Sequence, residues 1–176
     1  MRPLRLLSWG IVLAIFAHTA ATYGALPERI PTNVGFNGVA DRFGDRTLGR
    51  WFLLPGIALG ILLLFEFITR LMRTRPDLLN IPEKERFVRL PARFREPVDA
   101  VIATMMDSMV IAIVLLMGLI QWSLWRIATG QPGAPGVLLV LAPFPITFVA
   151  LLQIGRITNA VDDADRRWQA EGSPTA

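Results

Sequence analysis

Of the ionisable side chains inside the long apolar runs, two lie deepest, and they are the residues whose types suggest chemistry. His18 is the single histidine of the chain, and Asp107 lies just before the apolar stretch MVIAIVLLMGLIQWSLW. At a rise of about 1.5 Å per helical residue, both lie roughly 13 to 18 Å from the same membrane face, so we expect them to meet. Ionisable groups at that depth mark proton or ion pathways. The pair also fits a structural hydrogen bond between helices, and both interpretations stay open.

The other residue patterns that carry enzyme chemistry are missing or wrongly spaced. The chain has no cysteine, no His-Glu-x-x-His motif and no Gly-x-Ser-x-Gly motif. Four side chains offer oxygen ligands to calcium: Asn33, Asn37, Asp41 and Asp45. Their spacing differs from that of an EF-hand and lacks its final Glu, so we interpret them as turn residues. The sequence therefore predicts a non-enzymatic protein without a metal or a cofactor.

Long apolar elements must position these residues. Hydrophobic residues make up 53% of the 176-residue chain and charged residues 18%, below the roughly 25% of soluble domains, which excludes an ordinary soluble protein. The sequence predicts an all-α membrane protein that forms a single transmembrane domain over residues 1–176. Because lipid tolerates no exposed backbone, each apolar run is expected to be helical. Four transmembrane helices are expected, at about 6–27, 51–69, 98–125 and 137–157.

The first apolar run has an alternative interpretation. Arg2 and Arg5, a short apolar stretch and the small residues around Ala20 also resemble a cleavable signal peptide. We favour a membrane span, because the apolar character continues as far as Leu26. Intact-mass measurement distinguishes the two, since cleavage removes about 20 residues.

The distribution of basic residues predicts the orientation in the membrane. Lys and Arg number 2 before the first span, 8 in loop 70–97 and 3 from Arg156 onward, against 4 in loop 28–50 and 1 at Arg126. The positive-inside rule then places both termini in the cytoplasm of a bacterial cell, with the protein in the inner membrane. Loop 28–50 is expected outside, and loop 70–97 and tail 158–176 are expected inside.

The loops are rich in residues that break helices. The outer loop is expected to be compact and ordered by turns, with Asn37-Gly38 as its strongest turn signal. Prolines at 76, 82, 91 and 97 are expected to divide the cytoplasmic loop into short segments that lie against anionic lipid headgroups, with no role for nucleic acid. Pro143 and Pro145 are expected to kink the fourth span. The tail is expected to be a solvated helical extension.

Two groups of loop residues resemble the SdpI family of small membrane proteins, which includes the immunity protein of the sporulation-delay toxin system. The outer-loop motif consists of Pro27, Pro31, Asn33, Asn37, Gly38, Asp41, Phe43, Gly44 and Arg46, and the cytoplasmic motif of Asn80, Pro82, Lys84, Arg95 and Glu96. The resemblance covers roughly residues 6 to 97. Members of the family commonly have His where this chain has Asn33 and Trp where it has Phe43.

The resemblance implies a role in toxin immunity or sensing. In that role the outer loop and the helix tops would meet a peptide or protein partner, in addition to the lipid bilayer around the helices. The alternative from the residues themselves is a small proton- or ion-coupled transporter that uses Asp107 and His18.

Overall fold

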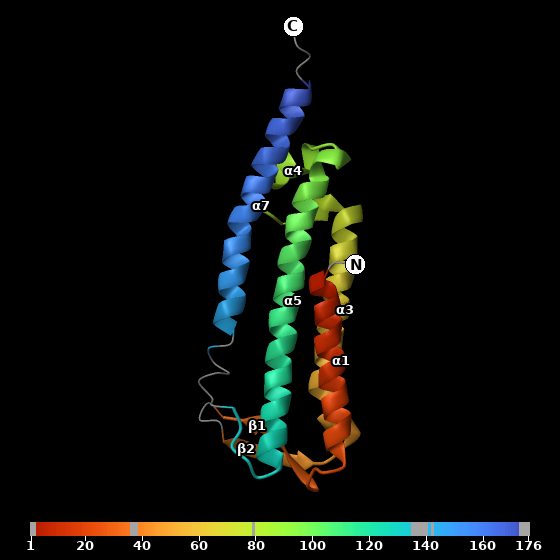
Figure 1. The fold of residues 1–176 in the computed structure, drawn as a ribbon, viewed down its shortest axis with the longest axis vertical. Coiled ribbons are helices and arrows are strands. Elements are labelled where there is room, and N and C mark those ends of the chain that lie inside the picture. The colour runs from red at the N-terminus through yellow and green to blue at the C-terminus, as the bar shows by residue number, and fades with distance from the viewer. Residues whose placement is uncertain (1–2, 36–38, 79, 135–140, 142, 173–176) are drawn as a thin grey trace. The chain divides into compact units, whose positions relative to one another are not determined.

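The computed structural model describes residues 3–35, 39–78, 80–134, 141 and 143–172. Helices dominate the chain (Figure 1). The elements in chain order are α1 (Pro3–Tyr23), β1 (Arg29–Val34), β2 (Ala40–Asp45), α2 (Leu48–Trp51), α3 (Leu53–Thr74), the 3₁₀ helix η1 (Pro76–Leu78), α4 (Lys84–Arg89), α5 (Ala92–Ala128) and α7 (Pro143–Gly172).

Three helices among the described residues are long and apolar enough to cross a membrane. They are α1, α3 and α5, with 21, 22 and 37 residues. A bilayer core needs about 20 apolar residues, so the expectation of a helical membrane protein is confirmed at this level. The fourth predicted span, 137–157, begins among residues outside the described part. Its described portion belongs to α7, which starts at Pro143 and continues to Gly172, and a fourth crossing stays a prediction.

One of the expected helix breaks is wrong. Helix α5 begins at Ala92 and runs through Pro97, whereas we expected a break there. An interior proline costs a helix about 3 kcal/mol. The flanking side chains Phe94 and Val98 are 7% and 0% exposed, and burial of two such side chains contributes roughly 1.5 to 3 kcal/mol each. Packing on both sides of Pro97 therefore outweighs its local cost.

The outer loop contains a β-hairpin, which the sequence analysis did not predict. Strands β1 and β2 pair in antiparallel fashion, with Ile30 opposite Gly44 and Pro31 opposite Phe43. The register shifts on both sides of Asn33. The N–H of Gly35 donates to the carbonyl of Val39 at 2.9 Å beyond the strands. The predicted turn at Asn37-Gly38 lies outside the described residues.

The chain divides into two compact units, and each is described by itself. The first comprises residues 1–63 and 110–146, and the second comprises residues 64–109 and 147–176. Because α3 and α5 are long, each contributes one part to each unit. The expectation of a single transmembrane domain stays a prediction.

Each unit contains a hydrophobic cluster of its own residues. In the first unit Leu26, Ile30 and Trp51 pack with partly buried side chains from α1 and α5. In the second unit the core combines one face of α7 with the end of α3, α4 with the residue that follows it, and the first half of α5. Its buried side chains are Met72, Phe87, Leu90, Phe94, Val98, Ile102, Ile157, Val161 and Ala164. As far as Gly172 the tail is thus helical, as expected, but it is not simply solvated. Its apolar face is part of a core.

Candidate functional site

Trp51 connects three helices at the hairpin end of the first unit. Its indole Nε1–H donates to the carbonyl of Thr19 on α1 at 3.0 Å, and its own carbonyl accepts a hydrogen bond from Gln121 Nε2 on α5 at 3.3 Å. All three residues are at most 2% exposed. Because an unpaired buried polar group costs about 1 to 3 kcal/mol, these bonds determine how α1, α2 and α5 meet.

The hairpin is attached to the end of α1 by Arg46 of the predicted motif. Its guanidinium donates to the carbonyl of Leu26 at 2.7 Å and lies 5.4 Å from the centre of the Tyr23 ring. The N–H of Arg46 also donates to the carbonyl of Glu28 at 2.7 Å. Arg46 therefore holds both ends of the hairpin against the helix, a structural role that the sequence motif did not reveal.

Two further motif residues bind each other across the hairpin. The side-chain amide of Asn33 donates to both carboxylate oxygens of Asp41, at 2.8 and 3.1 Å. Asn33 and Asp41 are two of the four side chains that offer oxygen ligands to calcium, and here they bind each other instead. Within the described residues, no group of three His, Asp or Glu side chains gathers as a metal site would require.

Gly44 makes room for an arginine. A Cβ atom at this position would lie 2.8 Å from Nη1 of Arg50 and 3.0 Å from Cγ2 of Thr32. The Arg50 guanidinium uses that space to donate to the carbonyl of Asp45 at 3.0 Å. The remaining described motif residues differ in burial, since Pro31 is buried whereas Pro27 and Phe43 are exposed. Asn37 and Gly38 lie outside the described residues.

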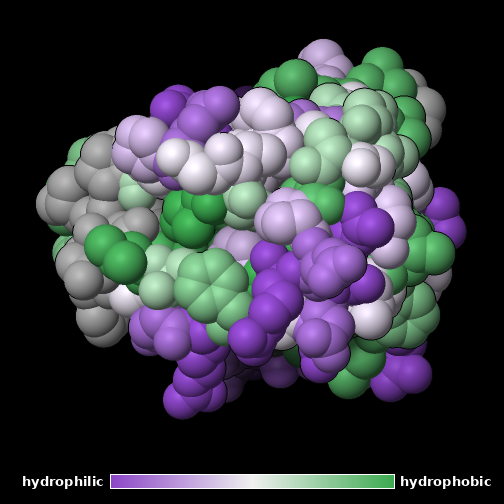
Figure 2. All heavy atoms as spheres, turned by 90° about the horizontal axis from the view of Figure 1, so that it is seen from below, coloured by the Kyte–Doolittle hydropathy of each residue, from purple (hydrophilic) through white to green (hydrophobic). Residues whose placement is uncertain are grey.

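A pocket of about 530 Å³ lies beside this end of the first unit. It is lined by residues of β1, α2, the start of α3 and the second half of α5: Ile30, Pro31, Thr32, Asn33, Val34, Arg50, Trp51, Leu53, Leu54, Ile120, Gln121 and Leu124. Its volume falls in the range of small-ligand sites, and its apolar walls with few polar groups are typical of them. Seen from the hairpin end, the surface shows hydrophilic side chains gathered beside hydrophobic ones (Figure 2).

Most residues of this pocket were missed by the sequence analysis. The outer-loop motif includes Pro31 and Asn33 of the pocket but not Arg50, Trp51 or Gln121. A signal was present in Gln121, a polar residue within the apolar run of the third span. Polar residues in such runs often mark contacts between helices, but only the fold shows that Gln121 meets Trp51.

His18 and Asp107 fall in different units. His18 is half-buried on α1, with its ring nearly perpendicular to that of Trp125 and 5.3 Å away between centres. Its Nε2 is buried and has no hydrogen-bond partner among the described residues. Asp107 is half-buried on α5 in the second unit. Their pairing stays a prediction.

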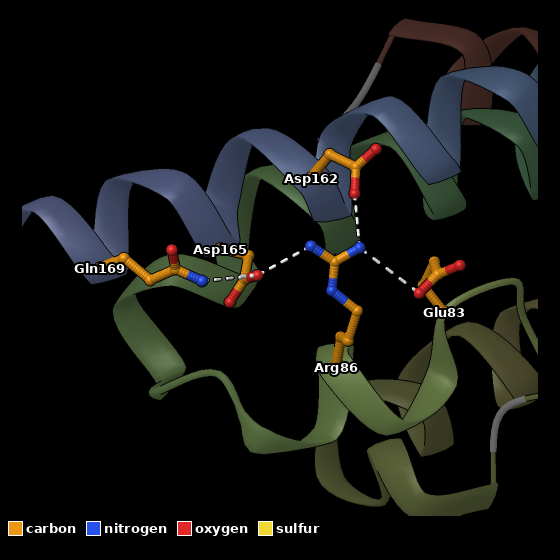
Figure 3. A network of polar contacts seen from close by, with 5 residues as sticks. All are labelled: Glu83, Arg86, Asp162, Asp165 and Gln169. Atoms are coloured by element: carbon orange, nitrogen blue, oxygen red, sulfur yellow. Dashed lines mark hydrogen bonds and ion pairs between the residues drawn. The ribbon is translucent and has the colours of Figure 1, made fainter.

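The cytoplasmic motif surrounds an arginine that the sequence analysis did not single out. Lys84 opens α4, and Arg95 and Glu96 lie in the first turns of α5, while Asn80 and Pro82 are exposed before α4. Between them, Arg86 donates to Asp162 at 2.6 Å and to Asp165 at 2.8 Å, both on α7 (Figure 3). The hydrogen bonds to Asp165 and then Asp162 raise the pKa of Arg86 above its ordinary value.

Comparison with known proteins relates the N-terminal part of the chain to a family of unknown function. Residues 10–59 match the family model of DUF1648, a domain of unknown function. The match begins in α1, includes the whole hairpin and α2, and ends in α3. No curated protein and no solved structure matches the chain. The described part of the chain is thus mostly helical and includes three helices apolar enough to cross a membrane, and residues 10–59 are similar to DUF1648.

Proposed function

We propose that this protein is a non-enzymatic membrane protein that binds a peptide segment of a partner in the pocket at its hairpin end, as an SdpI-like immunity or sensing module. The single observation that carries the proposal is the pocket of about 530 Å³ beside β1. All of its lining on β1, α2 and α3 comes from the segment that matches the domain of unknown function.

The shape of the pocket favours an extended peptide. Five consecutive residues of β1, from Ile30 to Val34, line it, so it follows the strand. Among the described residues β1 pairs with β2 alone, which leaves its other edge for an added strand. Peptides bind such edges through backbone hydrogen bonds, while alternate side chains enter pockets. Apolar side chains suit the walls, and Arg50, Asn33 and Gln121 offer polar contacts.

The distribution of basic residues supports an orientation with this end outside the cell. Thirteen Lys and Arg residues fall in the segments assigned to the cytoplasm and five in those assigned to the outside. In a bacterial inner membrane, this orientation presents the hairpin pocket to secreted peptides and the basic loop 70–97 to anionic headgroups.

A challenge experiment with a defined peptide tests the proposal. Toxin-sensitive cells that produce the wild-type protein are exposed to the sporulation-delay toxin peptide, the ligand that the family resemblance suggests. We expect protection by the wild type and loss of protection with Leu53→Trp, because the indole fills the pocket. The matched control is Ile57→Trp, which places the same side chain one turn further along α3, also at an exposed position but outside the pocket lining.

Three results would contradict the proposal. The first is equal protection by the Leu53→Trp and Ile57→Trp variants, and the second is no protection by the wild type. The third is proton flux in liposomes that contain the purified protein, if that flux is lost in Asp107→Asn. The third result would favour the transporter alternative, in which Asp107 and His18 carry protons.

A further inference from the structure

A second pocket lies within the second unit, between one face of α5 and one face of α7. Its volume is about 340 Å³. On each helix the lining residues recur three or four positions apart, as on a single helix face. They are Arg93, Phe94, Pro97 and Val101 on α5, and Ala160, Asp163, Ala164, Arg167 and Glu171 on α7. It shares no residue with the hairpin pocket, so its ligand is independent of the function proposed for that pocket.

The pocket carries balanced charges. Two arginines and two carboxylates line it, so its formal net charge is zero. Arg93 and Glu171 neutralise each other through an ion pair of 2.9 Å. The side chains of Asp163 and Arg167 form no hydrogen bond or ion pair with any described residue. They stand four residues apart on α7, and side chains at this spacing are neighbours on a helix surface.

The pocket also has an apolar part, and it lies where apolar helix surface gives way to charge. On α7 the exposed side chains Leu151, Leu152 and Ile154 precede Arg156 and the charged segment that contains the pocket residues. Helix α5 has 37 residues; at about 1.5 Å per residue it is roughly 25 Å longer than a bilayer core of about 30 Å. Its charged first turns therefore extend into the headgroup region, and the pocket is at that level.

We propose that this pocket binds a phospholipid whose headgroup carries both a phosphate and a primary ammonium group, as in phosphatidylethanolamine. The phosphate accepts hydrogen bonds from Arg167, and the ammonium donates to the carboxylate of Asp163 one turn away. Phe94, Pro97, Val101 and Ala160 contact the apolar part of the lipid. Charge-assisted hydrogen bonds of this kind are the stronger ones in proteins.

Two other headgroup classes fit the pocket less well. An anionic headgroup is attracted by the two arginines but repelled by the carboxylates of Asp163 and Glu171. A quaternary ammonium group lacks N–H donors and is usually bound by aromatic rings. Phe94 is the one aromatic residue in the lining, and the guanidinium of Arg93 already covers its ring at 4.6 Å.

Lipid titration followed by native mass spectrometry tests the inference. The full-length protein in detergent is titrated with phosphatidylethanolamine, phosphatidylcholine and phosphatidylglycerol of equal chain length, and with soluble glycerophosphoethanolamine. We expect phosphatidylethanolamine to bind about tenfold more tightly than the other three, which corresponds to one good charge-assisted contact. Arg167→Gln and Asp163→Asn should each remove this preference. The matched control is Arg166→Gln, which removes the same charge from an adjacent exposed residue outside the pocket.

Any of three outcomes would overturn the inference. Phosphatidylglycerol that binds as tightly as phosphatidylethanolamine indicates plain attraction to basic residues. Glycerophosphoethanolamine that binds as tightly as the lipid shows that the apolar part is not used. An Arg166→Gln variant that loses the preference as Arg167→Gln does would place the contact elsewhere. The comparison of lipids on the wild-type protein remains decisive if a variant fails to fold.

Discussion

At the scale of single residues, the indole N–H of Trp51 connects α2 to α1 through the carbonyl of Thr19. Trp51→Phe keeps an aromatic ring but removes this buried donor and leaves the carbonyl without it. We expect the free energy of unfolding to fall by about 1 to 2 kcal/mol, as for loss of a buried hydrogen bond. Chemical denaturation in detergent micelles measures the change. Trp122→Phe is the control, because Trp122 is 37% exposed and a phenyl ring still accepts the cation–π contact from Arg126; equal losses in both variants would contradict the role of Trp51.

Gly44 and Gly49 give a second comparison at this scale. In Gly44→Ala the new methyl group meets Arg50, which can move, and the methyl group of Thr32 at 3.0 Å, which is on a stiff side chain. We expect a loss of about 1 kcal/mol of stability, the lower range for overpacking. In Gly49→Ala nothing lies within 4 Å of the new atom, and alanine favours the helix, so stability should stay equal or rise by up to about 1 kcal/mol. Thermal melts of the two variants that coincide would show that the space beside Gly44 is not needed.

At the scale of elements, α7 docks on α4 through Arg86. The guanidinium reaches Asp162 and Asp165, one turn apart on α7, and Glu83 at 3.4 Å on its own side (Figure 3). The pKa of Arg86 is raised in the folded protein. The ion pairs of Arg86 therefore stabilise the fold fully at any pH below the ordinary pKa of arginine, and this stabilisation is lost only as the pH rises through the raised pKa. From neutral pH into the alkaline range, the arginine therefore stays charged and keeps α7 in place.

Replacement of this arginine should loosen α7. In Arg86→Gln we expect trypsin to cleave faster after Arg166 and Arg167, because α7 leaves its contact with α4 more often. The difference in cleavage rate between this variant and the wild type should shrink in about 1 M salt, because the Debye length there is only about 3 Å. Arg89→Gln is the matched control on the same helix, since Arg89 is exposed and makes no ion pair with a described residue. Cleavage rates that do not differ between the two variants would mean that the apolar face of α7 alone holds it.

At the scale of the whole molecule, the contact between the basic loop and the tail limits how the chain crosses a membrane. Arg86 of the loop and Asp162 of the tail touch, so they lie on the same side. Helix α5 starts directly after the loop and is long enough to reach the other side. If α5 crosses the membrane, we expect the chain to cross back before the tail. This contact favours four crossings, although three helices meet the length and apolarity of a span among the described residues.

Topology tags test the number of crossings. Reporters at both termini and at position 85 should report the cytoplasm, and a reporter at position 38 should report the outside, as the basic residues predict. A C-terminal reporter on the opposite side from position 85 would exclude a fourth crossing. A cytoplasmic reporter at position 38 would reverse the orientation and with it the proposed access of secreted peptides to the hairpin pocket.

The sequence by itself determined the features that depend on local composition. Runs of about 20 apolar residues predict helices that suit a membrane wherever the rest of the chain lies, and α1, α3 and α5 appear where three of the runs were found. The ion pair between Glu66 and Arg70, at 3.5 Å, follows from their i,i+4 spacing alone. The prolines at 76, 82 and 91 interrupt the loop as their chemistry requires.

Only the tertiary structure decided the features that join distant parts of the chain. Arg86 and Asp165 are 79 residues apart in the sequence, and no local pattern shows which carboxylate will meet which guanidinium. The hairpin was missed because Pro31 and Asn33 weaken the strand signal, and pairing with β2 and contact of Ile30 with the core compensate for it. Pro97 stays inside α5 for the same reason. In each case the free energy of packing between distant segments exceeds a local preference of a few kcal/mol, and the sequence shows only the local preference.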